Sequence, residues 1–164
     1  MGARVPGRLD GEAADRAGAV DQHVLATVRA STPLHPSGRA GVLTDPVTGA
    51  ALRAMHREPA HPWAVAALAA ETGLSRAPFA RRFTEALGQP PLTYLTWWRL
   101  TLAADLLRTT DHTVATVSAR VGYASEFAFA TAFKRRSGTP PGRYRRDAVT
   151  RASARRTLDG LGHR

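Results

Sequence analysis

Arginine supplies nearly all of the positive charge of this chain, and its side chain carries the chemistry of anion binding. All of the cations except Lys134 are arginines. Arginine presents a planar fork of N–H donors that fits a phosphate group or the edge of a guanine base. The chain is therefore a candidate for contact with nucleic acid, and a solvated cationic surface is the alternative interpretation.

The charge of the whole chain points the same way. Its 164 residues include 23 Lys and Arg against 13 Asp and Glu, a formal net charge of +10. Residues 45–146 hold 14 of these cations and 7 of the acids. Strongly basic proteins attract polyanions such as nucleic acid, although net charge alone does not identify the partner.

Other classes of function lack the residues that they need. The chain has no cysteine, which excludes disulfides, thiolate zinc sites and cysteine nucleophiles. It has no glycine-rich phosphate loop and no HExxH motif, and its six histidines show no metal-ligand spacing. The longest apolar stretch, WAVAALAA at 63–70, is too short to span a bilayer. We therefore predict a cytoplasmic protein that is not an enzyme, with no cofactor, metal site or membrane contact.

The pattern Gly-x-Pro-Pro-x-x-Tyr occurs twice, as GQPPLTY at 88–94 and GTPPGRY at 138–144. The match at a separation of fifty positions also extends upstream of these two motifs. The matching pairs, upstream and within the motifs, are Ser75 and Ser125, Phe79 and Phe129, Phe83 and Phe133, Gly88 and Gly138, Pro90 and Pro140, and Tyr94 and Tyr144. Repeats at such a period indicate a duplicated structural unit.

Each copy of the longer repeated unit, which ends in the Gly-x-Pro-Pro-x-x-Tyr motif, predicts a helix, a glycine-containing turn and a second helix. In the first copy Gly73 marks the turn and Ser75 starts the second helix, and in the second copy Gly122 and Ser125 take these places. Apolar residues repeat three or four positions apart on both sides of each turn. The Gly-x-Pro-Pro pattern then ends the second helix. This order is typical of a helix-turn-helix.

Residues 92–109, between the copies, predict one long helix with an apolar face that includes Leu95, Trp98 and Leu102. Its 18 residues span roughly 27 Å. Successive major-groove segments on one side of B-DNA lie roughly 34 Å apart, so such a helix is long enough to present two groove-binding helices. The alternative is an ordinary core helix of an all-α bundle.

Residues 43–146 closely resemble the DNA-binding domain of AraC/XylS-type bacterial transcription regulators. The motifs that carry the resemblance are VGYASE, AFKRRSG and PPGRYR, together with LAAETGLSRAPFARRF upstream. The resemblance implies an all-α, homeodomain-like fold in which a long central helix joins two helix-turn-helix subdomains. It implies a sequence-specific regulator that binds double-stranded promoter DNA, and many relatives activate transcription by contacting RNA polymerase.

The resemblance also assigns the DNA-facing positions. Expected base contacts are Arg76, Ala77, Ala80 and Arg81 in the first unit, and Glu126, Phe127, Ala130 and Thr131 in the second. Expected phosphate contacts are Ser75, Arg82, Ser125, Lys134, Arg135 and Arg136. Relatives commonly carry a small residue at the position of Phe127 and arginine at the position of Thr131. We therefore expect the second unit to add affinity and positioning more than sequence choice.

The sequence divides into three parts. Residues 1–44 predict a helix over 11–30 and a linker, too little chain for a ligand-binding barrel, so no small-molecule effector is expected. We interpret this part as a remnant of a sensor domain in a stand-alone protein, a truncated paralogue or a gene whose start is misplaced. Residues 45–146 form the DNA-binding domain, and 147–164 predict a basic disordered tail. The alternative function is a truncated antagonist or protein-interaction module that acts on a full-length regulator or RNA polymerase.

Overall fold

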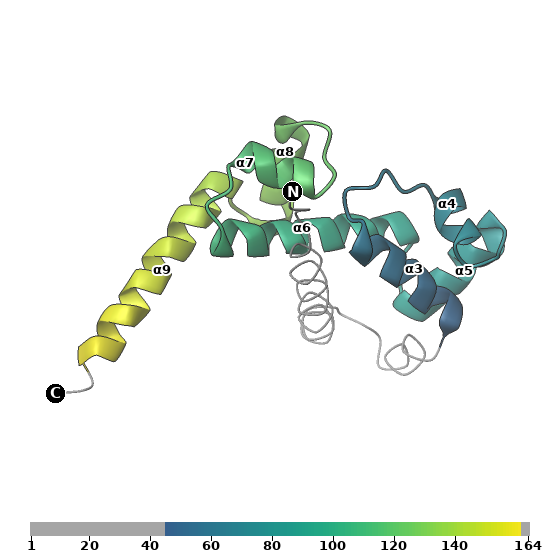
Figure 1. The fold of residues 1–164 in the computed structure, drawn as a ribbon, viewed down its shortest axis with the longest axis horizontal. Helices are drawn as coiled ribbons and strands as arrows, with labels where there is room; N and C mark the ends of the chain where they lie inside the picture. The colour runs from purple at the N-terminus through teal and green to yellow at the C-terminus, as the bar shows by residue number, and fades with distance from the viewer. Residues whose placement is uncertain (1–44, 162–164) are drawn as a thin grey trace, which may run out of the picture.

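The computed structural model describes residues 45–161, and every regular element in this part of the chain is a helix. In chain order these are α3 (Pro46–Arg57), α4 (Val65–Ala70), α5 (Arg76–Leu87), α6 (Pro91–Thr109), α7 (Val114–Arg120), α8 (Glu126–Ser137) and α9 (Pro141–Leu161). Figure 1 shows α6 running through the middle of the molecule, with α3, α4 and α5 around one end and α7 and α8 on the other part. The all-α fold class predicted from the sequence is confirmed.

The long helix α6 contributes to two separate hydrophobic cores. The first core joins α3, α4 and α5 to the N-terminal half of α6, and its members are Ala51, Met55, Leu68, Ala69, Phe79, Phe83, Leu87, Tyr94, Leu95 and Trp98. The second joins α7 and α8 to the C-terminal half, and its members are Leu100, Ala103, Leu107, Val117, Val121, Phe129 and Phe133. Each helix-turn-helix unit therefore has its own core, and α6 serves both.

Four glycines bend the chain at equivalent points of the two units. Gly73 and Gly122 lie in the turns with φ of 73° and 80°, and Gly88 and Gly138 end α5 and α8 with φ of 71° and 76°. Side-chain-bearing residues adopt this left-handed region at a cost, which glycine avoids. The duplicated unit predicted from the sequence is present in the backbone.

Helix starts follow the predicted caps with one exception. Asp45 accepts a hydrogen bond from the Thr48 backbone N–H at 3.2 Å, and α3 starts at Pro46 as expected. Ser125 Oγ accepts from Ala128 N at 3.2 Å at the start of α8. Ser75 lies at the equivalent place before α5 without a side-chain capping bond.

The predicted disordered tail is wrong as far as Leu161, because α9 continues through it without a break. Near its start α9 packs on the second unit, where the ring centroids of Tyr144 and Phe133 lie 5.3 Å apart. The segment is rich in alanine and arginine, which favour helix even where few apolar residues are available for a core. The predicted helix over 11–30 and its linker lie outside the described residues.

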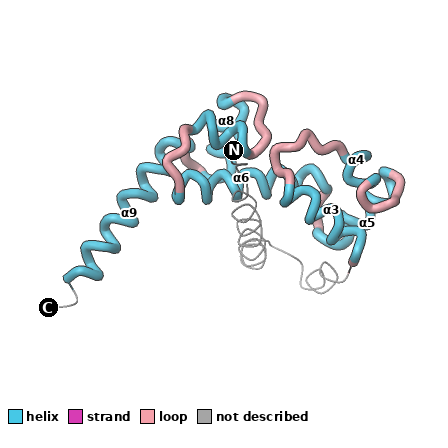
Figure 2. Tube along the Cα trace, viewed as in Figure 1, coloured by secondary structure: helices cyan, strands magenta, loops and turns pink. Residues whose placement is uncertain are grey.

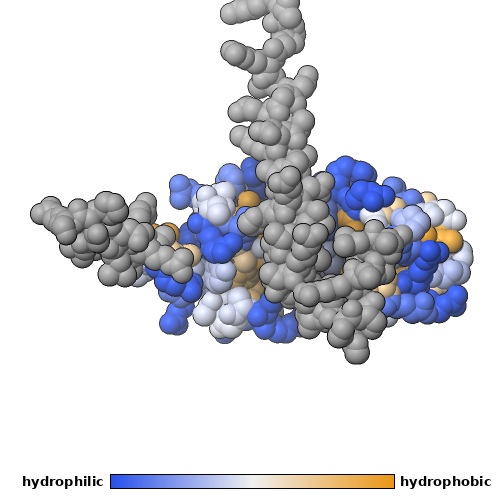
Figure 3. Space-filling view, turned by 90° about the horizontal axis from the view of Figure 1, so that it is seen from below, coloured by the Kyte–Doolittle hydropathy of each residue, from blue (hydrophilic) through white to orange (hydrophobic). Residues whose placement is uncertain are grey.

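No helix within residues 45–161 is long and apolar enough to cross a membrane. Figure 3, a view from below Figure 1, shows mainly hydrophilic residues on the part of that face that is drawn in colour, with smaller apolar areas between them.

Candidate nucleic-acid interface

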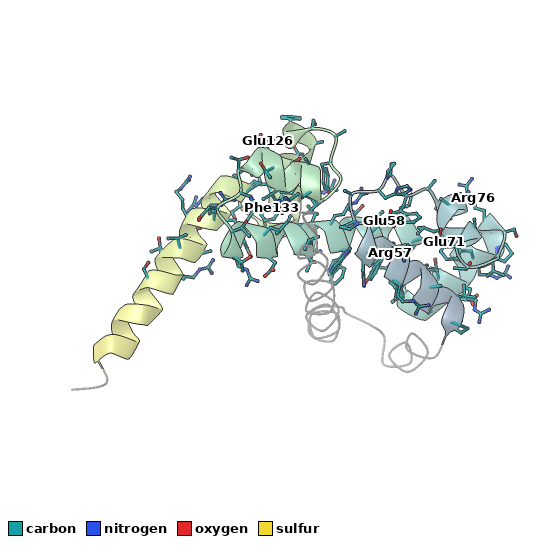
Figure 4. All side chains as sticks on the ribbon, viewed as in Figure 1. Arg57, Glu58, Glu71, Arg76, Glu126 and Phe133 are labelled. Carbon is teal, nitrogen blue, oxygen red and sulfur yellow. The ribbon has the colours of Figure 1, made fainter. Side chains whose placement is uncertain are left out.

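Helix α5 separates its buried and exposed residues as the sequence predicted. Phe79 and Phe83 are completely buried, with ring centroids 5.7 Å apart. The positions expected to face DNA lie on the other side, where Arg76, Ala77 and Arg81 are exposed and Ala80 is partly buried. Figure 4 shows Arg76 at the outer edge of the first unit. The helix thus presents two arginines and two small residues outward.

Arg81 is an exposed cation of this surface with one long ion pair. Its side chain is 73% exposed, and its Nε lies 4.0 Å from Glu85 Oε1, one turn further along α5. Ion pairs this exposed contribute little to stability, so exchange of Glu85 for another acceptor costs little. A guanine edge is the base surface that matches its donor geometry best.

Arg82 is already engaged within the protein. Its Nη2 donates to Asp45 Oδ1 at 2.6 Å, which ties α5 to the cap of α3. The contact leaves the Arg82 side chain half exposed. The sequence prediction of a phosphate contact therefore stays a prediction, and the structure adds a role in joining two helices of the first unit.

Helix α8 repeats the same division with different side chains. Phe129 and Phe133 are buried, with ring centroids 5.6 Å apart, while Glu126, Phe127 and Thr131 are exposed. Figure 4 places Glu126 on the side of this unit away from α6 and Phe133 over α6. Phe127 is 83% exposed, more than the other exposed large apolar residues described, Leu92 and Val149. A phenylalanine so exposed gains by contact with an apolar group of a partner.

The three cations at the end of α8 differ in their surroundings. Lys134 and Arg135 are exposed. Burial raises the pKa of Tyr123, and the positive charges of Arg99 and Arg135 oppose that rise. Arg136 extends toward α6, where its Nη2 donates to Thr101 Oγ1 at 3.0 Å and its Cζ lies 5.4 Å from the centroid of the Trp97 ring. Burial lowers the pKa of Arg136. Lys134 and Arg135 are therefore better placed than Arg136 for a phosphate contact.

Two further contacts, besides those of Arg82 and Arg136, were not predicted from the sequence. The buried hydroxyl of Tyr94 lies 2.8 Å from His56 Nε2, which links the first Gly-x-Pro-Pro motif to α3. Arg99 donates to the backbone carbonyl groups of Pro59 and His61. Both join segments about forty positions apart, which periodicity cannot reveal. No group of His, Asp or Glu within the described residues has the arrangement of a metal site.

Comparison with known proteins agrees with this geometry. A helix-turn-helix domain model matches residues 68–147. The chain is 47% identical over 124 residues to a putative AraC-like transcription regulator of Streptomyces lividans, covering 76% of this chain and 41% of that protein. It resembles the DNA-binding domain of AdpA, solved in complex with a target DNA, at a TM-score of 0.61 and 33% identity, covering 66% of this chain and 96% of that domain. The chain belongs to the AraC/XylS family.

Other AraC/XylS relatives agree over a similar region. The transcriptional regulator AlkR of Acinetobacter baylyi is 40% identical over 106 residues, covering 65% of this chain and 35% of that protein. The chain spans about two fifths of the length of the Streptomyces regulators that it matches. The similarity therefore concerns the DNA-binding domain of these AraC/XylS proteins.

Within this AraC/XylS domain the equivalent helices α5 and α8 are chemically unequal. The outward face of α5 carries Arg76 and Arg81, whereas the equivalent face of α8 carries Glu126, Phe127 and Thr131. Glu126 lies in the first turn of α8, where the helix dipole favours a negative charge. The first unit thus offers donors, and the second an acceptor beside an apolar ring.

Proposed function

We propose that the chain is a sequence-specific DNA-binding regulator of transcription that places α5 and α8 in successive major-groove segments of promoter DNA. One observation carries the proposal: two equivalent helices bury paired phenylalanines and expose the opposite face, and one helix joins their cores. The 19 residues of α6 give it a length of about 28 Å. That length is close to the roughly 34 Å between groove segments on one side of B-DNA.

The two units contribute differently to this binding. Arg81 donates to a guanine edge, with Arg76 at the start of the same helix, so the first unit selects sequence. Glu126 accepts from a cytosine amino group, and Phe127 contacts a thymine methyl group. Lys134 and Arg135 add phosphate contacts, which hold the second unit on the DNA without a base preference.

The proposal also covers partners other than DNA, namely RNA polymerase and small-molecule effectors. RclR of Escherichia coli, 40% identical over 104 residues, is a transcriptional activator by name. By analogy we infer that this protein contacts RNA polymerase at its promoters, in the bacterial cytoplasm and in association with the nucleoid. We infer also that no small-molecule effector binds within this chain.

Selection of bound duplexes from a random DNA pool tests the function. We expect one asymmetric consensus, with a guanine-containing segment that loses its enrichment when Arg76 and Arg81 are both replaced by alanine. Binding that is salt-sensitive but equal on all sequences would contradict the proposal. It would favour instead a protein-interaction module that antagonises a full-length regulator.

A further inference from the structure

The turn of the second unit lies against a loop of the first. Gly122 lies between α7 and α8, and Ala60 lies in the loop 58–64 between α3 and α4. A Cβ atom on Gly122 would be 2.8 Å from Ala60 Cα and 2.9 Å from the Ala60 carbonyl oxygen. Figure 2 shows these two loops approaching each other beside α6. The two helix-turn-helix units therefore meet through their backbones.

Arg99 joins this contact to the central helix. Its Nε donates to the carbonyl oxygen of Pro59 at 2.7 Å, and its Nη2 donates to that of His61 at 2.8 Å. The same Nη2 would be 2.9 Å from a Cβ on Gly122. Burial lowers the pKa of Arg99, as expected for a guanidinium enclosed by backbone. One side chain thus holds the loop to α6 and borders the turn of the other unit.

The loop that meets Gly122 is stiff. Pro59 and Pro62 each restrict the backbone, since proline fixes φ. The rings of His61 and Trp63 have centroids 4.3 Å apart, and Trp63 Nε1 donates to the Glu58 carbonyl oxygen at 3.0 Å. A loop braced in this way transmits a displacement of Gly122 to the first unit instead of absorbing it.

Arg136 makes a second contact between the units. It comes from α8 in the second unit, and its guanidinium lies over Trp97, which packs against the first core. Its hydrogen bond to Thr101 fixes it on α6. Rotation of the second unit about α6 would have to break this contact as well as the contact at Gly122.

We propose that Gly122, Ala60 and Arg99, together with Arg136 on Trp97, form a lock that fixes α5 relative to α8 and so sets the DNA spacing that the protein accepts. The part about DNA rests on the proposed function. Each added base pair moves a groove segment by roughly 3.4 Å and turns it by roughly 35°. Two helices held rigidly match one spacing, whereas two helices free to rotate match several.

The duplicated fold supplies a matched control. Gly73 is the turn glycine of the first unit and has nearly the same positive φ as Gly122, but a Cβ atom there meets nothing within 4 Å. Alanine at either position therefore adds similar backbone strain. Only Gly122→Ala also presses on the other unit, so the difference between the two variants reports the contact between the units.

Distances between spin labels in the protein without DNA provide the first test. The chain has no cysteine, so Glu85→Cys on α5 and Ala128→Cys on α8 give two specific labels on exposed positions. We expect one narrow distance distribution in the parent and in Gly73→Ala, and a shifted or broader one in Gly122→Ala. Arg99→Met removes both carbonyl contacts without adding bulk, and we expect it to broaden the distribution even if Gly122→Ala does not fold. Parent-like distributions in the variants that fold would overturn the lock.

Binding to DNA with altered spacing provides the second test. The site selected by the parent is lengthened or shortened by one base pair between the two contacted segments. We expect the parent and Gly73→Ala to lose at least about fivefold in affinity, and Gly122→Ala or Arg99→Met to lose less than about twofold. Equal losses in all four proteins would contradict the role in spacing. If the parent selects no sequence, the proposed function fails while the label distances still decide the lock.

Discussion

Trp98 and Leu100 are two residues apart on α6 and belong to different hydrophobic cores. Two residues correspond to a rotation of roughly 200° about a helix axis, so the two side chains leave α6 on nearly opposite sides. The change of side at this point is what lets one helix complete two helix-turn-helix units. Arg99 lies between them and holds the loop of the first unit.

Separate cores predict separable effects of core mutations. Phe79→Ala and Phe129→Ala each remove a completely buried ring at equivalent positions, and we expect each to destabilise its unit by about 3–5 kcal/mol. Hydrogen exchange measured by mass spectrometry should rise most in α3–α5 for the first variant and in α7–α8 for the second. Equal increases in both units for either variant would show that the two cores unfold together.

Arg81→Ala tests the assignment of the base-contacting face. We expect a loss of about 1–3 kcal/mol in binding to the selected site and a relaxed preference at one base pair. Competition binding against single-base-pair variants of the site measures both effects. Arg108→Ala on α6, where Arg108 is paired with Asp105, removes the same charge and should leave the preference intact. An unchanged preference in Arg81→Ala would show that another residue faces the bases.

Lys134→Ala tests a contact of a different kind. Loss of one phosphate contact should weaken binding to all sequences alike and reduce the slope of log affinity against log salt by about one. Fluorescence anisotropy titrations at several salt concentrations provide the slope. If Lys134→Ala instead changed the order in which the protein prefers DNA sequences, as Arg81→Ala should, Lys134 would contact bases.

Asp45 links the stability of the first unit to pH. Burial raises its pKa, but hydrogen bonds from Thr48 and Arg82 outweigh burial and hold it below the ordinary value of 3.8. Because the folded pKa is the lower one, this stabilisation is present above pH 3.8 and is lost as the pH falls through the folded value.

Asp45→Ala should therefore lower the free energy of unfolding by about 1 kcal/mol at neutral pH, as expected for a lost helix cap. Urea unfolding at pH 7 and near pH 3 should show the difference from the parent shrinking at the lower pH. Asp45→Asn keeps a capping acceptor and should lose less than alanine. A difference between the parent and Asp45→Ala that does not change with pH would contradict the role of the charge.

The exposed ring of Phe127 predicts a dependence on the thymine methyl group. Replacement of the contacted thymine by uracil removes only that methyl, and should weaken parent binding by about 0.8 kcal/mol. The same replacement should have no effect on Phe127→Ala, which has no ring to contact the methyl. Anisotropy with the two duplexes and the two proteins gives the coupling directly. If the parent and Phe127→Ala were equally sensitive to uracil, a residue other than Phe127 would contact the methyl group.

Much of the fold follows from local patterns in the sequence. The positions of Gly73 and Gly122 mark turns because only glycine adopts their backbone conformation without strain. The spacing of Phe79 and Phe83 marks the buried side of α5, and thereby the exposed side as well. Local spacing is enough for these features because each depends on residues within one or two helical turns.

The side-chain contacts that the sequence did not predict join segments that are far apart in the chain. The engagement of Arg82 by Asp45 and of Arg136 by Trp97 and Thr101 depends on how the helices pack. Arginines on an exposed helix face look alike in sequence whether they are free or held. The basic composition of 147–164 predicts a disordered tail, but 147–161 are helical, because helix propensity does not require a core.

Trp98 and Leu100 leave α6 on nearly opposite sides, and this limits where residues can be inserted or deleted. An insertion of one residue there would turn everything beyond it by roughly 100°, so that Leu100 and Leu107 would leave the second core together. In the turn between α7 and α8, by contrast, two residues separate Gly122 from Ser125, whereas one residue separates Gly73 from Ser75 in the first unit. Length variation in this domain is therefore expected in its loops, while the central helix keeps a constant residue count.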